Sequence, residues 1–181
     1  MLNIANLLSL YRIVVIPVII YLSFLEVTIW SFIASILFIT AALSDFLDGY
    51  LARKHSIESK MGSFLDLVAD KLLIVSLLLW LTYSINTLEI LILSLILISR
   101  ELIISSIRQL VQSNNSSLSL LPNKYGKSKT VFQMISVSIL LLTSTYPSIT
   151  LYQAGILFLF VSVLLSLFSF FTYLSDYLRN L

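Results

Sequence analysis

Long apolar segments recur along this chain of 181 residues, and each has the length of a helix that crosses a membrane. The hydrocarbon core of a bilayer is about 30 Å thick, and about 20 helical residues span it. Hydrophobic residues make up 59% of the chain and charged residues only 11%, whereas a soluble domain averages about 25% charged residues. Water cannot solvate a compact fold of this composition, which excludes a soluble enzyme as well as a disordered chain.

The apolar segments point to helices, because they lack the alternation of a membrane β-barrel and the chain holds only 4 Gly and 3 Pro. We therefore predict an all-α integral membrane protein with six transmembrane helices, in a single domain over residues 1–181. The predicted helices are Leu8–Leu25, Ile29–Asp48, Gly62–Thr82, Thr87–Leu110, Lys127–Thr145 and Leu151–Tyr173.

Basic residues between the helices indicate the orientation. Six spans put both termini on one side, together with the second and fourth loops. Arg53, Lys54 and Lys60 fall in the second loop and Lys124 in the fourth, whereas the opposite loops hold no Lys or Arg. By the positive-inside rule, we expect a multi-pass protein of the inner (cytoplasmic) membrane with both termini and the active site facing the cytoplasm.

The chain has no cysteine and a single histidine, so a site built on thiolates or on several imidazoles is excluded. Any metal must be held mainly by carboxylates, which are the ligands of hard ions. The net charge is only +2, which gives a nucleic-acid partner no support.

Four aspartates stand where the second and third predicted helices meet. Asp45 and Asp48 are three residues apart, and Asp66 and Asp70 are four apart, so each pair shares a helix face. A charge inside a span costs about 2.5–3.5 kcal/mol, which makes such residues functional candidates. The short loop makes the two helices antiparallel neighbours, so we expect the four carboxylates to converge.

Four neighbouring carboxylates stay ionised only if cations neutralise them, and one or two Mg²⁺ or Mn²⁺ ions would do so. Gly49 and Gly62 leave room for a ligand, and Arg53 offers a fork suited to phosphate. The alternative is that the acids only form ion pairs at a wet interface, with Arg53, Lys54, Lys60 and Lys71 as their partners.

The pattern D-x-x-D-G-x-x-A-R, eight residues, then G-x-x-x-D-x-x-x-D resembles the signature of the CDP-alcohol phosphatidyltransferase family. Its fixed positions are filled by Asp45, Asp48, Gly49, Ala52, Arg53, Gly62, Asp66 and Asp70. The resemblance implies a six-helix transferase of the membrane that forms a homodimer. It implies transfer of a phosphatidyl group from a CDP-linked lipid to an alcohol, with release of CMP.

The resemblance also implies roles for single residues. Asp70 corresponds to the proposed general base of the family. The implied ligands of two Mg²⁺ or Mn²⁺ ions are Asp45, Asp48, Asp66 and Asp70. The implied CDP-binding positions are Asp48, Gly49, Ala52, Arg53 and Gly62.

Three further segments indicate the acceptor alcohol. R-E-L…R at Arg100–Arg108 and G-K-x-K-T…Q-M at Gly126–Met134 resemble stretches of family members that act on glycerol 3-phosphate. The opening Asn3–Arg12 is similar to theirs, although Ala5 stands where Pro is usual and Ser9 where Thr is usual. The resemblance thus implies CDP-diacylglycerol and glycerol 3-phosphate as substrates.

A small dianion such as glycerol 3-phosphate needs several cations in one place. Arg100 and Arg108 lie on one broad side of a helix, and Lys127 and Lys129 open the next helix, so we predict that the four bind the acceptor phosphate. Adjacent helical residues do not face each other, so we expect Arg100 to be unpaired. The alternative makes both lysines ordinary anchors. Arg12 is interpreted as a contact to lipid phosphate or to the cytidyl group, or as a snorkelling residue.

Other functions remain open at this point. Within the family, the acceptor could be phosphatidylglycerol, serine or inositol phosphate, as in cardiolipin, phosphatidylserine or phosphatidylinositol-phosphate synthesis. An intramembrane prenyltransferase also uses aspartate-rich motifs, although these are typically separated on more helices. An ion or proton transporter holds carboxylates near the bilayer centre between repeats, whereas this chain has one compact cluster towards one face and no visible repeat.

Overall fold

The computed structural model describes residues 4–55, 60–113, 124–143 and 146–179, and within them the side chains of residues 6–44, 62, 64–109, 128–143 and 146–175. These ranges form helices only, which confirms the predicted all-α class and the predicted order of six helices. The helices are α1 (Ile4–Phe24), α2 (Thr28–His55), α3 (Lys60–Ile85), α4 (Leu88–Ser113), α5 (Lys124–Thr143) and α6 (Ile149–Arg179).

Three of the predicted helix ends are wrong by more than a turn. The first helix begins at Ile4 and not at Leu8, and two helices continue past their predicted last residues. We expected the second helix to end at Asp48, but α2 continues to His55. A lone glycine costs a helix only about 1 kcal/mol, and the residues that follow Gly49 include good helix formers such as Leu51, Ala52 and Arg53. The last helix likewise continues past Tyr173 to Arg179.

Three of the described helices contain a stretch long and apolar enough to cross a membrane. These stretches are Asn6–Phe24, Leu88–Gln109 and Ile149–Ser175. Two shorter apolar helical stretches lie at Thr28–Ser44 and Ser128–Thr143. The length and composition of these helices are those of a membrane protein, in which a helix satisfies its own backbone hydrogen bonds.

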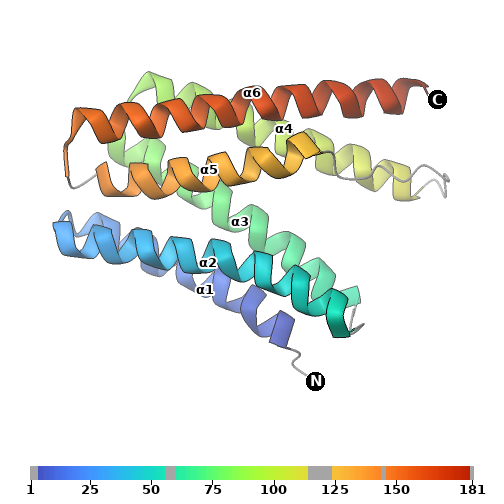
Figure 1. Ribbon diagram of the computed structural model, residues 1–181, viewed down its shortest axis with the longest axis horizontal. Helices are drawn as coiled ribbons and strands as arrows, with labels where there is room; N and C mark the ends of the chain where they lie inside the picture. Colours follow the sequence, from blue (N-terminus) through green and yellow to red (C-terminus); the bar gives the residue numbers. More distant parts are fainter. Residues whose placement is uncertain (1–3, 56–59, 114–123, 144–145, 180–181) are drawn as a thin grey trace.

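The helices close into a ring. Along this ring α1 packs on α2, α2 on α5, α5 on α6, α6 on α4, α4 on α3 and α3 on α1, and α3 also contacts α5 across it. Figure 1 shows α3 running obliquely between the α1–α2 pair and the group of α4, α5 and α6. Residues on α1 to α5 can therefore face a common interior.

Alternate helix ends gather at the two ends of the ring. The start of α1, the end of α2, the start of α3 and the end of α6 lie at one end, as the predicted topology requires (Figure 1). At the other end, the turns after α1 and α3 pass through Glu26 and Asn86 with φ of 52° and 51°. This left-handed conformation is a common way to stop a helix and reverse the chain.

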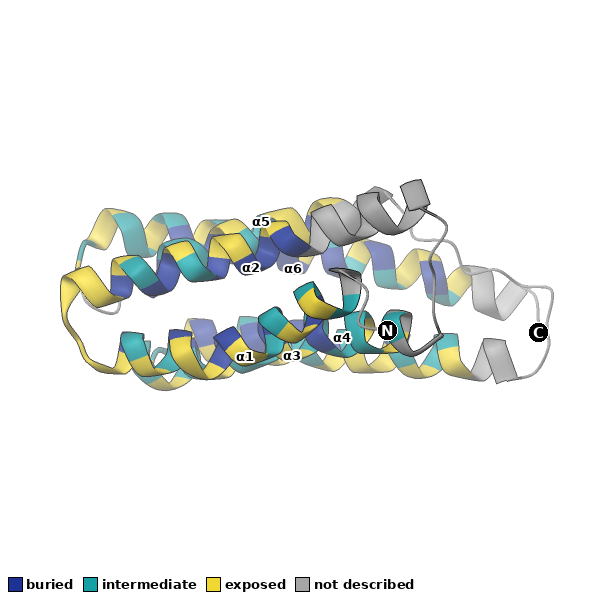
Figure 2. Ribbon diagram, turned by 90° about the horizontal axis from the view of Figure 1, so that it is seen from below, coloured by how far each residue is buried: buried dark blue, intermediate teal, exposed yellow. Residues whose placement is uncertain are grey.

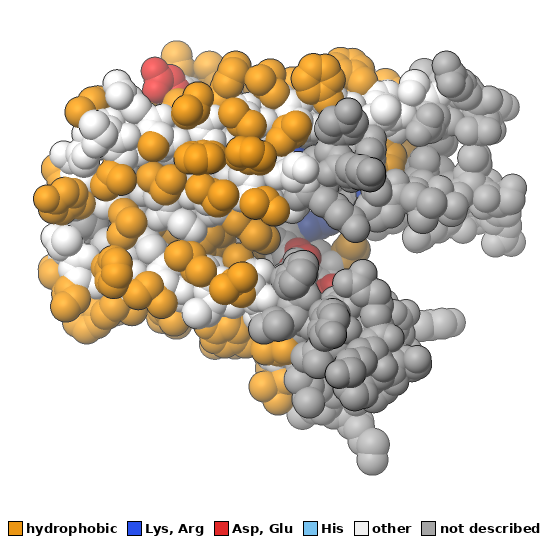
Figure 3. Space-filling model, viewed as in Figure 1, with side chains coloured by type: hydrophobic (Ala, Val, Ile, Leu, Met, Phe, Trp, Pro, Cys, Tyr) orange, Lys and Arg blue, Asp and Glu red, His pale blue; other side chains and the backbone are white. Residues whose placement is uncertain are grey.

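Apolar side chains cover the inside and the outside of the ring. Phe38, Leu77 and Leu140 are fully buried in its core, and the buried residues follow the inward faces of the helices (Figure 2). Large apolar residues such as Phe168 and Phe171 are exposed, and hydrophobic side chains cover most of the described part of the face in Figure 3. An outer surface of this kind fits lipid as the surrounding solvent.

Candidate active site

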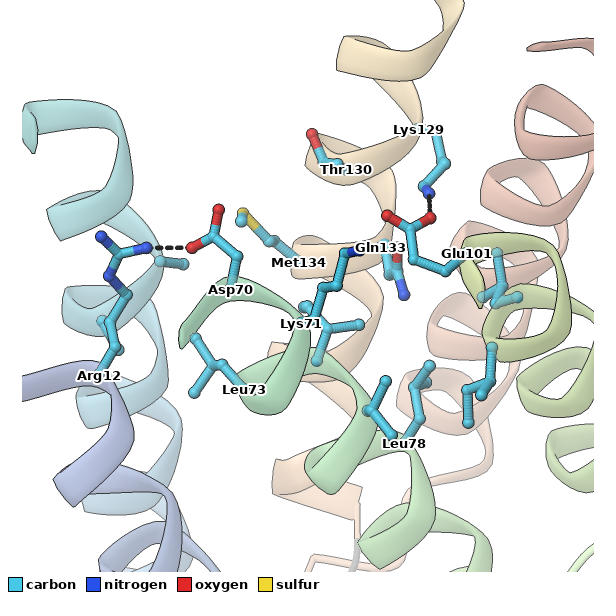
Figure 4. Close-up of a pocket in the computed structure, with 16 residues that line it drawn as sticks. Arg12, Asp70, Lys71, Leu73, Leu78, Glu101, Lys129, Thr130, Gln133 and Met134 are labelled. Atoms are coloured by element: carbon cyan, nitrogen blue, oxygen red, sulfur yellow. Dashed lines mark hydrogen bonds and ion pairs between the residues drawn. The ribbon is translucent and has the colours of Figure 1, made fainter. Parts of the chain in front are cut away.

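A cavity of about 130 Å³ lies inside the ring, lined by residues of α1, α2, α3, α4 and α5. Its volume far exceeds the roughly 10–15 Å³ that one water molecule needs. Apolar residues form part of its lining, and Leu73 and Leu78 lie below the charged residues in Figure 4. Charged side chains also line the cavity, and Figure 4 shows four of them on opposite walls: Arg12 and Asp70 on one side, and Glu101 and Lys129 on the other.

Asp70, on the first wall, shares Arg12 with Asp66, whose side chain is not part of the described cavity lining. We call Arg12, Asp66 and Asp70 the acid cluster. Asp66 and Asp70 lie one turn apart on α3, and both turn towards α1. The Nη2 atom of Arg12 donates to Oδ1 of Asp66 at 2.6 Å, and its Nη1 atom donates to Oδ1 of Asp70. One positive charge faces two negative charges, so the cluster keeps a net charge of minus one.

Burial differs sharply within the acid cluster. The side chain of Arg12 is 0% exposed, whereas those of Asp66 and Asp70 are 43% and 42% exposed. An arginine cannot lose its charge in a protein, so it is buried only where acids pair with it. Arg12 thus fixes α1 to α3 and holds both carboxylates in place, while much of their surface stays open.

The opposite wall reverses the charges: Glu101 and Lys129 line it, and Glu101 also pairs with Arg100, which lies outside the described cavity lining. We call Arg100, Glu101 and Lys129 the basic cluster. Oε2 of Glu101 accepts hydrogen bonds from Nη1 of Arg100 at 3.1 Å and from Nζ of Lys129 at 2.5 Å. Both cations are nearly buried, at 8% and 5% exposure, while Glu101 is 37% exposed. Two positive charges share one carboxylate, which leaves a net charge of plus one.

Helix α6 supports the basic cluster from behind. The Nε atom of Arg100 donates to the backbone oxygen of Ser166 at 3.2 Å. Two turns further along α4, Nη2 of Arg108 donates to the hydroxyl of Tyr173 at 3.0 Å, and its guanidinium lies 5.3 Å from the centre of that ring. The two arginines of α4 thus follow the seam between α4 and α6, and Arg100 also reaches back to Glu101.

The model of the family described as CDP-alcohol phosphatidyltransferase matches residues 2–171 of the chain. The chain belongs to the CDP-alcohol phosphatidyltransferase family. Bacterial relatives named CDP-diacylglycerol–glycerol-3-phosphate 3-phosphatidyltransferase are similar over almost the whole length. The relative from Escherichia coli (strain K12) is 35% identical over 173 residues, covering 96% of this chain and 93% of its own. The relative from Wigglesworthia glossinidia brevipalpis is 39% identical over 172 residues, covering 95% and 93%.

Three of the eight fixed positions of the family's signature fall within the described side chains. Asp66 and Asp70 lie on one face of α3, as predicted, since a single guanidinium binds both. Their described ion-pair partner is Arg12 on α1, and not Lys71, which the alternative interpretation named. Gly62 lies in the first turn of α3.

The other five fixed positions of the signature lie on the last turns of α2. The helix carries these positions at its end, but their side chains lie outside the described residues, and so does the side chain of Lys127 on α5. The predicted convergence of four carboxylates stays a prediction for this reason, and within the described side chains no three acids meet. The signature positions concerned are Asp45, Asp48, Gly49, Ala52 and Arg53.

The expectation that Arg100 is unpaired is wrong. The rule that adjacent helical residues do not face each other describes the directions of their Cβ atoms. An arginine side chain is long enough to curl back, and Nη1 of Arg100 reaches Oε2 of the next residue, Glu101. Of the four predicted acceptor residues, Arg100 and Lys129 meet at Glu101, whereas Arg108 contacts Tyr173.

Sequence reasoning missed the roles of Arg12 and Glu101. Arg12 is neither snorkelling nor directed at lipid, because its side chain is 0% exposed and bonded to two acids. A useful signal was present: a basic residue inside a span needs an acid, and Asp66 and Asp70 fall in the first turns of the predicted helix Gly62–Thr82, on the same predicted side as Arg12. Glu101 was considered only as a partner that Arg100 could not reach.

Proposed function

We propose that this chain transfers the phosphatidyl group of CDP-diacylglycerol to sn-glycerol 3-phosphate, giving phosphatidylglycerol phosphate and CMP. The names of its relatives, at 35–39% identity over nearly the whole chain, support this reaction. The observation that carries the proposal is one cavity lined by Arg12 and Asp70 of the acid cluster on one side and by Glu101 and Lys129 of the basic cluster on the other. The reaction can use both clusters. The acid cluster can hold a divalent cation against the diphosphate of the lipid, and the basic cluster can bind the anionic acceptor.

The acid cluster has the chemistry of a divalent cation site. Asp66 and Asp70 offer carboxylate oxygens one helical turn apart, and both are two-fifths exposed. Arg12 neutralises only one of the two charges. Carboxylates are the ligands that Mg²⁺ and Mn²⁺ prefer, and such ions commonly bind phosphates of a substrate as well. We expect Asp66 and Asp70, with Asp45 and Asp48 from α2, to hold two such ions.

A bound divalent ion would supply positive charge against the diphosphate as CMP leaves. The residues of the chain do the rest. Arg100 and Lys129 bind the phosphate of the acceptor, and Arg12 holds Asp70 in position. The hydroxyl oxygen of glycerol 3-phosphate attacks the lipid-side phosphorus, the bond from phosphorus to the CMP oxygen breaks, and Asp70 accepts the hydroxyl proton. In Figure 4 one oxygen of Asp70 is turned to Arg12 and the other points away from it.

The membrane arrangement follows the same proposal. All six helices cross the membrane, with both termini and the open end of the site at the cytoplasmic face of the inner membrane. The acyl chains of the lipid substrate then remain in hydrocarbon while its diphosphate enters the polar part of the cavity. We further propose that the protein works as a homodimer, as the family resemblance implies.

The test uses purified protein in detergent with CDP-diacylglycerol and a panel of acceptors, and measures release of CMP. The panel holds glycerol 3-phosphate, phosphatidylglycerol, serine and inositol phosphate. We expect CMP with glycerol 3-phosphate and at most a trace with the other three. Equal or faster CMP release with another acceptor would reassign the substrate, and no release with any of them would refute the transferase activity.

A further inference from the structure

Lys71 stands between the two clusters. It follows Asp70 directly on α3, lines the cavity, and is half-buried. Asp70 turns towards Arg12, while the ammonium of Lys71 donates a hydrogen bond to Oγ of Ser105 on α4. In Figure 4 it extends into the space between Asp70 and Glu101. Its charge therefore lies where the two substrates must meet if the proposed function is right.

The described contacts of Lys71 differ from those of the other cations that line the cavity. Arg12 is bonded to two carboxylates and Lys129 to Glu101. The described partner of Lys71 is the hydroxyl of Ser105, which carries no charge. A half-buried ammonium among apolar helices is costly unless an anion approaches it. Within the described part of the cavity, Lys71 is the cation without a carboxylate partner.

We propose that Lys71 binds a phosphate oxygen of a substrate, at the junction of the acid and basic clusters. This inference rests on the proposed function. Two groups share the required chemistry: the phosphate of the acceptor and the diphosphate of the CDP-linked lipid. The hydrogen bond to Ser105 leaves the positive charge of Lys71 available, because a hydroxyl does not neutralise it.

A purely structural role makes a different prediction. If the bond between Lys71 and Ser105 only ties α3 to α4, loss of either partner has the same effect. If the charge binds phosphate, loss of the charge matters and loss of the hydroxyl does not. Lys71→Gln removes the charge and keeps a hydrogen-bond donor, whereas Ser105→Ala removes the hydroxyl and keeps the charge. The two variants form a matched pair, and Lys71→Arg tests rescue by another cation.

The experiment measures KM for glycerol 3-phosphate and for CDP-diacylglycerol separately in each variant. We expect Lys71→Gln to raise one of the two KM values about tenfold or more, the size of a lost charge-assisted hydrogen bond. Ser105→Ala should stay within about twofold of the parent protein, and Lys71→Arg should recover most of the loss. A rise confined to glycerol 3-phosphate assigns the acceptor phosphate, and a rise confined to the lipid assigns the diphosphate. Unchanged KM values, or equal effects of Lys71→Gln and Ser105→Ala, would overturn the inference.

Equilibrium dialysis with inorganic phosphate provides a readout without turnover. The parent protein and Ser105→Ala should bind phosphate equally, and Lys71→Gln should bind it about tenfold more weakly. If phosphate binding depends on Lys71 but no CMP is released with any acceptor, the proposed function is refuted and the phosphate site at Lys71 is supported. If CMP release is normal but Lys71→Gln binds phosphate as well as the parent protein, the proposed function is supported and the inference about Lys71 is refuted. Thermal unfolding of each variant in detergent checks that the fold is intact.

Discussion

The acid cluster and the basic cluster are built alike with the charges exchanged. In the acid cluster, one arginine holds two aspartates, and in the basic cluster, one glutamate holds an arginine and a lysine. The pattern of burial is the same in both clusters, because the basic side chains are the buried partners in each. Arg12 is hidden behind its acids at 0% exposure, and Glu101 stands in front of its cations at 37% exposure.

In both clusters the acidic side chains are therefore more exposed than the basic side chains that they contact. The two aspartates keep about two-fifths of their side-chain surface exposed, whereas the nearly buried Arg100 and Lys129 both contact Glu101. We therefore propose that the acid cluster takes up a cation directly, while the basic cluster exchanges the carboxylate of Glu101 for the phosphate of the acceptor.

Metal removal tests the acid cluster most strongly. If divalent ions complete this cluster, excess EDTA should stop CMP release entirely, and added Mg²⁺ or Mn²⁺ should restore it. The control is EDTA that has been saturated with the same ion beforehand, which should not inhibit. Turnover that continues in EDTA at an unchanged rate would show that Asp66, Asp70 and Arg12 act without a metal.

The next largest effect is expected for Asp70→Asn. The amide cannot accept the proton of the attacking hydroxyl, so CMP release should fall by about 10²–10⁴-fold, the usual contribution of a general base. CDP-diacylglycerol should still bind, because the amide retains an oxygen and the shape of the side chain. Rates of CMP release and binding of the lipid are measured on the same preparation. Full turnover by this variant would refute the assignment of Asp70 as the base.

Arg12→Gln tests whether the buried cation holds the acid cluster together. Removal of one partner from a buried ion pair costs about 3–5 kcal/mol, and we expect the lower end because both aspartates are partly exposed. The two carboxylates should then bind Mg²⁺ more tightly, so Mg²⁺ should raise the unfolding temperature more in this variant than in the parent protein. Arg12→Lys keeps the charge and serves as the control.

An unchanged unfolding temperature in Arg12→Gln would contradict this view. So would a Mg²⁺ response equal to that of the parent protein, because it would mean that Arg12 and the metal do not share the same two carboxylates. Circular dichroism in detergent follows both quantities in one titration.

Glu101→Gln makes the matching change in the basic cluster. It leaves Arg100 and Lys129 without their shared anion, so we expect a lower unfolding temperature, equivalent to about 2 kcal/mol, since Glu101 is more exposed than Arg12. Inorganic phosphate should restore much of this loss, because it replaces the missing carboxylate and binds only the folded protein. Phosphate that stabilises the parent protein and Glu101→Gln equally would show that the anion does not replace Glu101.

Local features of the site were predictable from the sequence, and the pairing across helices was not. Asp66 and Asp70 share a face because they are four residues apart on one helix, which the sequence shows directly. The choice of Arg12 as their partner joins residues 54 and 58 positions apart. Lys129 similarly meets Glu101 across 28 positions. Such contacts depend on which helices are neighbours in the ring, and spacing along one helix carries no information about that.

Helix boundaries show the same limit on a smaller scale. The apolar pattern located each helix, but a helix can continue beyond its last apolar residue. α2 therefore continues for seven residues beyond Asp48, to His55, in a sequence that is polar and still favourable for a helix. This extension places Arg53 on the same helix as the first two aspartates of the signature, instead of in a loop.

The smallest expected effect concerns Arg108, which lies two turns beyond Arg100 on α4 and contacts α6. Its guanidinium contacts the hydroxyl and the ring of Tyr173, and this partner does not neutralise its charge. Arg108→Ala should therefore raise KM for glycerol 3-phosphate about fivefold, near 1 kcal/mol, with kcat little changed, because a distant cation contributes to binding of the anion more than to the reaction.

Tyr173→Phe is the matched control for Arg108, since it removes the hydroxyl and keeps the ring under the guanidinium. If Arg108 acts through its charge, this variant should stay within about twofold of the parent KM, because one neutral hydrogen bond contributes little. Equal effects of the two variants would mean that Arg108 serves only to pack α4 on α6. An unchanged KM in Arg108→Ala would remove the residue from the acceptor site and leave Arg100 and Lys129, which Glu101 already holds, as its described members.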